Sequence, residues 1–184
     1  MAFRMRISEE EREILRKVAR DAAARAMGLR AAAPPEIPAG SLLSRPAPVF
    51  VTWRRDGRPR GRSGTVAPEA GLVSLVERFA VEALLHDPRV PPATAKELPR
   101  YVPEISVLSP FEEIFGAEGL LPGTQGVIAE KGKRWGIVFP ADAKGLDWDG
   151  ARLLSQACLR AGLPEESWQA PGRPRLLRFT AEVF

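Results

Sequence analysis

The sequence predicts an α+β fold in which most strands pair in antiparallel fashion and helices flank the sheet. Three observations lead to this prediction. The expected strands form hairpins, one across Asp56-Gly57 and one across Lys131-Gly132-Lys133. Only three segments have the length and amphipathic period of substantial helices. The chain also lacks the alternating strand-helix rhythm of a doubly wound parallel sheet.

The length and composition of the chain indicate which class of protein it belongs to. The chain has 184 residues, 45% of them hydrophobic and 27% charged, which suits a globular domain with a sizeable core. Its net charge of +4 is a weak indication of anionic partners. No apolar run approaches the ~20 residues that cross a bilayer, and the N-terminal segment lacks the apolar stretch of a secretory signal. With Cys158 alone, no internal disulfide forms, so we expect a cytoplasmic protein.

The chain begins with a helix followed by a connector. Residues 8–29 carry apolar side chains at helical spacing, and Ser8 with Glu11 matches a capping box. Residues 31–48 are rich in proline and predict an irregular connection.

A hairpin and a second helix follow. Residues 49–53 are β-branched and aromatic, as in a strand. Asp56-Gly57 predicts a two-residue type I′ turn, in which both positions need positive φ. Residues 60–66 form either a return strand or a glycine-loosened loop. A helix at 72–85 ends before His86-Asp87-Pro88, as helices do before proline.

The second half of the chain predicts more hairpins and a third helix. The expected elements are a strand at 103–109, a hairpin at 126–140, a helix at 148–163 and a last strand at 173–184.

Residues 54–64, "RRDGRPRGRSG", hold five arginines and three glycines and are the best candidate site. On a strand, alternate arginines share one face and could bind phosphate or carboxylate. The glycines could turn backbone N–H groups toward the same anion. The alternative is a solvated basic edge strand whose charges prevent association. The candidate ligand-binding residues here are Arg58, Arg60, Gly61, Arg62, Ser63 and Gly64.

Several charged residues elsewhere are secondary candidates. Asp87 could pair with an arginine of the row and fix its geometry, and Arg89 could add an anion contact. His86 is better explained by its place at a helix C-terminus, where a cation is favoured. Glu97 and Glu104 could bind a cation or act as acid and base, and Glu104 is also a candidate ligand-binding residue. Structural ion pairs with arginine explain both more simply.

Other sites have weaker support. A Ser63–His86 pair lacks the sequence context of a nucleophile elbow. One His and one Cys cannot supply a transition-metal ligand set, although a carboxylate-only Mg²⁺ site stays open. Trp53 beside the basic hairpin could stack on a nucleic-acid base, yet it fits a core position better. Cys158 lies on an apolar helix face and is expected in the core.

Six segments, in order along the chain, resemble the AMMECR domain family. They include "FVTW…G…PRGRSG" at 50–64, "HDPRVPP" at 86–92 and "EISVLSP" at 104–110. The resemblance implies one domain over residues 1–184, with two unequal lobes and a cleft between them. It implies no established activity. Because prokaryotic members often occur with Memo-like and radical-SAM proteins, it does imply pathway partners of those kinds.

The chain departs from the family pattern at chemically important positions. The family's Leu-Arg-Gly-Cys-Ile-Gly segment reads "PRGRSG" here, so Arg62 stands at the cysteine and Ser63 at the isoleucine. The Gly-x-His-Gly turn of many members is "GTQG" at 123–126. A cysteine nucleophile with a histidine base therefore cannot operate at these positions.

Taken together, the sequence predicts a ligand-binding or regulatory protein with an anionic, phosphate-bearing ligand at the arginine–glycine segment and no cofactor. Two alternatives stay open. One is an enzyme acting on a nucleotide or phosphorylated metabolite, with Asp87, Glu97 or Glu104 as acid or base. The other is a protein–protein interaction module. Nucleic acid is a less favoured partner, and no membrane association is expected.

Overall fold

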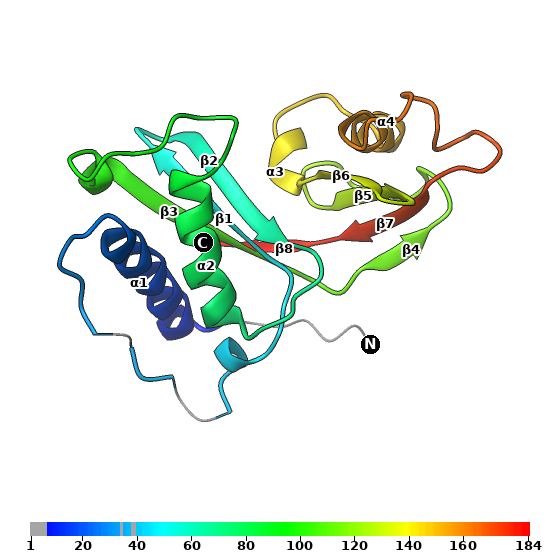
Figure 1. Ribbon diagram of the computed structural model, residues 1–184. Helices are drawn as coiled ribbons and strands as arrows, with labels where there is room; N and C mark the ends of the chain where they lie inside the picture. The colour runs from blue at the N-terminus through cyan, green and yellow to red at the C-terminus, as the bar shows by residue number, and fades with distance from the viewer. Residues whose placement is uncertain (1–6, 34, 38–39) are drawn as a thin grey trace. The chain divides into compact units, whose positions relative to one another are not determined.

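The computed structural model describes residues 7–33, 35–37 and 40–184 (Figure 1). The N-terminal residues 1–6 and parts of the predicted connector, 34 and 38–39, lie outside the described residues. The fold is α+β, as predicted. The chain divides into two compact units, with Leu108–Ala181 forming unit 2, and the residues before it together with Glu182–Phe184 forming unit 1.

Unit 1 is built on a four-stranded sheet. The strand order is β2-β1-β3-β8, so β2 lies at an edge. β1 pairs antiparallel with both β2 and β3, which confirms the first predicted hairpin. The strands are β1 (Val49–Arg55), β2 (Arg58–Thr65), β3 (Tyr101–Leu108) and β8 (Ala181–Val183).

The hairpin turn has the expected backbone. Asp56 adopts φ 52° and Gly57 φ 75°, so both central residues are left-handed, as a type I′ turn requires. Only two residues separate β1 from β2. The aspartate–glycine pair therefore specifies the turn that the sequence predicted.

Helices α1 (Glu9–Ala26) and α2 (Leu72–Leu85) cover one face of this sheet (Figure 1). The capping box is confirmed, because the Glu11 backbone N–H donates to Ser8 Oγ and the Ser8 N–H donates to the Glu11 carboxylate. α1 ends earlier than predicted, and Gly28 takes φ 71° just beyond it. Two short 3-10 turns complete the unit, at Leu42–Ser44 and Leu98–Arg100.

The core of unit 1 lies between the helices and the sheet. Val49, Val51 and Trp53 alternate along β1 and point into it, each fully buried. The Trp53 Nε1–H donates to the Ala80 carbonyl at 2.8 Å. Trp53 is thus a core residue, and the suggestion that it stacks on a base is wrong.

Unit 2 contains a second four-stranded sheet with α4 (Gly150–Arg160) packed on it (Figure 1). The hairpin predicted at 126–140 is present as β5 and β6, while β4 and the short α3 were not predicted. The helix predicted at 148–163 is shorter at both ends. The strand order is β4-β7-β5-β6, with β4 (Glu112–Ile114), β5 (Gly126–Lys131), β6 (Arg134–Val138) and β7 (Arg175–Phe179), and α3 spans Pro140–Ala143.

The last predicted strand, 173–184, is two strands in two different sheets. β7 belongs to the sheet of unit 2 and β8 to the sheet of unit 1. The interruption falls at Thr180, whose N–H donates to Ser109 Oγ while its carbonyl accepts from the Ser109 N–H. Those bonds use the Thr180 backbone for a local contact with Ser109 instead of a continuous ladder. In the described part of the chain, no helix combines the length and apolar character of a membrane span.

Candidate functional site

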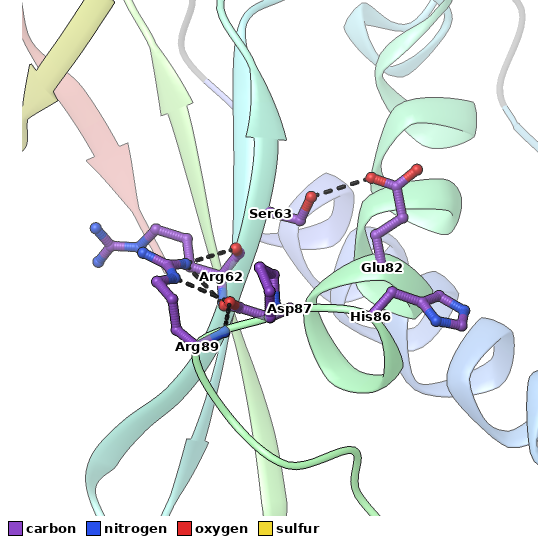
Figure 2. Close-up of a pocket in the computed structure, with 7 residues that line it drawn as sticks. Arg62, Ser63, Glu82, His86, Asp87 and Arg89 are labelled. Carbon is purple, nitrogen blue, oxygen red and sulfur yellow. Dashed lines mark hydrogen bonds and ion pairs between the residues drawn. The ribbon is translucent and has the colours of Figure 1, made fainter. Parts of the chain in front are cut away.

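A shallow pocket of about 570 Å³ lies in unit 1 between the edge strand β2 and the end of α2 (Figure 2). Polar and charged side chains dominate its lining. Most of them come from the arginine–glycine segment and from the turn that follows α2. The lining residues are Arg62, Ser63, Glu82, His86, Asp87, Pro88 and Arg89.

Asp87 and Arg89 attach this turn to the edge of β2. The Arg62 backbone N–H donates to Asp87 Oδ2 at 2.8 Å. Arg89 donates from Nε to Asp87 Oδ1 at 2.9 Å and from Nη2 to Oδ2 at 2.7 Å. The same Nη2 also donates to the Arg62 carbonyl at 3.0 Å. The N–H and the carbonyl of Arg62 that point away from β1 are thus both hydrogen-bonded to the turn. Asp87 contacts the arginine–glycine segment, as predicted, but through the Arg62 backbone.

The electrostatics of Asp87 follow from these bonds. The Arg89 guanidinium, against the opposing effect of burial, holds the pKa of the Asp87 carboxyl far below its usual range. The Arg62 and Arg89 backbone N–H groups act in the same direction. The Asp87 side chain is only 2% exposed, while that of Arg89 is 68% exposed. A buried carboxylate therefore orients an arginine that stays accessible to solvent.

A β-bulge interrupts β2 inside the candidate segment. Trp53 pairs with Gly61, but the next residue of β1, Arg54, pairs with Pro59. Arg60 is the extra residue, without a partner in the ladder. Its Nε is buried and finds no hydrogen-bond partner in the described structure.

The predicted row of three arginines on one face is therefore wrong. Arg62 pairs with Thr52 and donates to its Oγ1 from Nε at 2.8 Å. Arg58 pairs with Arg55. Paired residues share a face, and Thr52 and Arg55 lie on opposite faces of β1, so Arg58 and Arg62 do too. The bulge at Arg60 causes the switch, and binding of an anion by all three together loses its geometric basis.

Close packing of neighbouring backbone leaves no room for a side chain at Gly61 or Gly64. A Cβ at Gly61 would lie 1.9 Å from the Ala83 carbonyl oxygen of α2. At Gly64 it would lie 2.3 Å from the Val49 carbonyl oxygen. These contacts explain both glycines by close approach of backbone, without a ligand.

The predicted acidic candidates are engaged in ion pairs. Glu104 receives two hydrogen bonds from the Arg54 guanidinium, at 2.7 and 3.1 Å. Glu97 accepts from Arg55 at 2.7 Å. The structural explanation given for both from the sequence is confirmed, and Glu104 lines neither pocket described beside β2.

His86 and Ser63 are not a catalytic pair in this structure. His86 is the C-cap of α2, and Figure 2 shows its ring pointing away from Asp87 and Arg89. Ser63 Oγ instead donates to Glu82 at 3.1 Å, and Glu82 also accepts from Arg78 at 2.8 Å. Glu82 was not predicted, because the sequence shows only its spacing from Arg78 on the helix and not that its side chain faces β2.

Two further predictions concern metal and thiol chemistry. Among the described residues, no group of three His, Cys, Asp or Glu side chains is arranged to hold a metal ion. Cys158 is fully buried in the core of unit 2, and burial raises the pKa of its thiol. Its predicted place in the core is confirmed.

The chain's residues 16–184 match the AMMECR1 family. A protein from Thermococcus gammatolerans is 36% identical over 190 residues, covering 97% of this chain and 92% of that protein. Protein TK0174 from Thermococcus kodakarensis is 35% identical with the same coverage. The crystal structure of the uncharacterized protein PH0010 from Pyrococcus horikoshii superposes with a TM-score of 0.86 and 31% identity. That match covers 96% of this chain and 92% of PH0010.

These relatives come from archaea, and the α+β fold of this chain is the fold of the PH0010 crystal structure. The chain belongs to the AMMECR1 family, as its ordered motifs suggested.

Proposed function

We propose that this protein is a binding protein whose pocket beside β2 accepts a small anionic ligand carrying phosphate or carboxylate. The observation that supports the proposal is the geometry of Arg89. Two hydrogen bonds to buried Asp87 fix its guanidinium, and the side chain is still largely exposed. Its Nη1 has no hydrogen-bond partner among the described residues. A fixed guanidinium loses little conformational entropy when it binds an oxyanion.

The other charges of the pocket set the expected strength. Arg62 also lines the pocket and contributes positive charge, although its Nε donates to Thr52. The Ser63 hydroxyl lines the pocket too, but it donates to Glu82. Glu82 opposes an anion, although Arg78 partly offsets its charge at 2.8 Å. Binding should therefore be modest and should weaken as salt screens the attraction.

The enzymatic alternative has less support. A carboxylate whose pKa is held far below its usual range, as in Asp87, is a weak general base near neutral pH. Glu97 and Glu104 are both committed to arginine partners. An accessory role beside Memo-like or radical-SAM proteins stays a proposal that rests on the family resemblance alone.

The test is calorimetry with inorganic phosphate, pyrophosphate and acetate at low salt. Arg89→Gln should weaken binding about tenfold or more, a loss of roughly 1.4 kcal/mol. Arg58→Gln is the matched control, since it removes the same charge from an exposed residue outside the pocket. Equal losses in both variants would show that net charge, and not the pocket, attracts the anion.

A third variant separates binding from folding. Glu82→Gln removes a like charge from the pocket wall and should strengthen anion binding severalfold. Its side chain is about one-third exposed, so the fold should tolerate the change. If the unmutated protein binds none of the three anions at low salt, the proposal fails.

A further inference from the structure

The pocket beside Asp87 continues along β2 into a second hollow of about 410 Å³. Ser63 and Glu82 line both, so the two hollows adjoin. The second follows β2 through Gly64 and Thr65 on one side and α2 on the other. Together they form a groove, here called the β2 groove, between an edge strand and a helix.

The backbone of β2 offers hydrogen bonds to this groove. Arg62 points its N–H and carbonyl away from β1, because both are bonded to the turn at Asp87 and Arg89. Outward backbone groups recur every second residue along a strand. Gly64 therefore presents its N–H and carbonyl on the same edge, roughly 7 Å further along. No hydrogen bond joins these two groups to a described residue outside the sheet, and β1 lies on the opposite side of β2.

The protein's own turn shows which chemistry fits this edge. At Arg62, Asp87 supplies an acceptor and Arg89 a donor, as a neighbouring strand would. The turn forms these strand-like hydrogen bonds only with Arg62. Gly64 is therefore the next residue of β2 whose outward backbone groups could pair with an added strand. Edge strands with such exposed groups are templates for an added strand.

We propose that the β2 groove binds the carboxyl-terminal end of an extended peptide, which adds to β2 as an antiparallel strand. The terminal carboxylate meets Arg89, and the peptide backbone pairs with Gly64. This inference rests on the proposed anion site, because the carboxylate is the anion. With the carboxylate at the Arg62 end, the peptide runs opposite to β2.

The charges and apolar side chains that line the β2 groove are complementary to the carboxyl-terminal end of a peptide. Its Asp87 end carries Arg62 and Arg89, while Glu69 lies in the other hollow. A carboxylate at one end and a basic side chain upstream complement that order. Leu75 and Phe79 of α2 line the second hollow and provide an apolar contact for a side chain of the peptide.

The first experiment compares two arrays of random hexapeptides, one with free carboxyl termini and one amidated. The protein should bind a subset of the free acids at least tenfold more strongly than their amides, and Arg89→Gln should abolish the difference. No preference for the free acids would overturn the inference. If phosphate or acetate binds in calorimetry but no hexapeptide binds more tightly than acetate, the peptide inference fails and the anion site stands. If neither anions nor peptides bind, both fail.

The second experiment locates the peptide. With the tightest hexapeptide bound, the Gly64 amide proton should exchange with D₂O at least tenfold more slowly. Backbone N-methylation of the peptide should remove that protection. Unchanged Gly64 exchange in the complex would overturn strand addition. Protection that grows with protein concentration without peptide would show that a second copy occupies the edge, and would equally overturn it.

Discussion

The Asp87 carboxylate accepts hydrogen bonds from Nε and Nη2 of Arg89. The same Nη2 also donates to the Arg62 carbonyl on the edge of β2. Two residues apart in sequence, Asp87 and Arg89 fasten the turn after α2 to the sheet. The pair closes one position of the strand edge and fixes an exposed guanidinium beside it. Stability, and the ligand binding proposed for this pocket, should therefore both depend on this contact.

Asp87→Asn should destabilise the protein by about 2 kcal/mol, because it removes a charge from a buried acceptor of four hydrogen bonds. Urea unfolding measures the loss. Asp56→Asn is the control, since its pair with Arg100 is exposed and Asn suits the same turn. It should change stability by less than about 0.5 kcal/mol. Similar losses in the two variants would contradict a structural role for Asp87.

The stabilisation from Asp87 should depend on pH. Its pKa is lowered in the folded protein, so the carboxylate stays ionised where the unfolded chain already takes up a proton. The stabilisation is therefore complete above the unfolded pKa, near ~3.9, and declines as pH falls below it. The stability difference between the unmutated protein and Asp87→Asn should shrink from pH 5 to pH 2. A constant difference over that range would show that the charge is not responsible.

Gly61→Ala should cost about 2 kcal/mol or more, because the new Cβ would meet the Ala83 carbonyl oxygen at 1.9 Å and push β2 from α2. Gly116→Ala is the matched control. A Cβ there meets nothing within 4 Å, so its effect should stay within about 0.5 kcal/mol. Thermal unfolding of both variants would decide, and a stable Gly61→Ala would imply that strand and helix can separate at little cost.

Cys158 should react slowly with a thiol reagent in the native protein and quickly in denaturant. Its side chain is fully buried, and burial raises the pKa of the thiol, so little thiolate is present or accessible. Absorbance on reaction with a chromogenic disulfide measures both rates. Rapid labelling without denaturant would place this thiol in an opening segment of unit 2.

The sequence predicted the features that depend on interactions between residues close together in the chain. Asp56-Gly57 specified its turn because few residues tolerate two successive left-handed positions. Ser8 and Glu11 specified a helix start for a similar reason, since both bonds lie within one turn. The α+β class followed from the hairpins and the scarcity of helices.

The site was harder to predict because tertiary contacts decide it. Nothing in "RPRGRSG" shows the bulge, which arises where Gly61 approaches Ala83 and sends Arg58 and Arg62 to opposite faces. The sequence predicts Arg89 as an anion contact, but it does not show that Asp87 fixes the guanidinium of Arg89 from two residues away. The role of Glu82 depends on the distance between a helix and a strand, which sequence periodicity does not encode.

The path of the chain through the two units bears on how the protein is made. Residues up to Val107 supply β1, β2, β3 and both long helices, but β8 comes only after all of unit 2. During synthesis on the ribosome, β3 therefore has no partner strand at its outer edge until residues 108–181 and β8 have been made. At ~5–20 residues per second this interval lasts several seconds, far longer than a hairpin needs to form. Nascent chains should pass through a three-stranded intermediate whose exposed edge is a natural point of contact for chaperones.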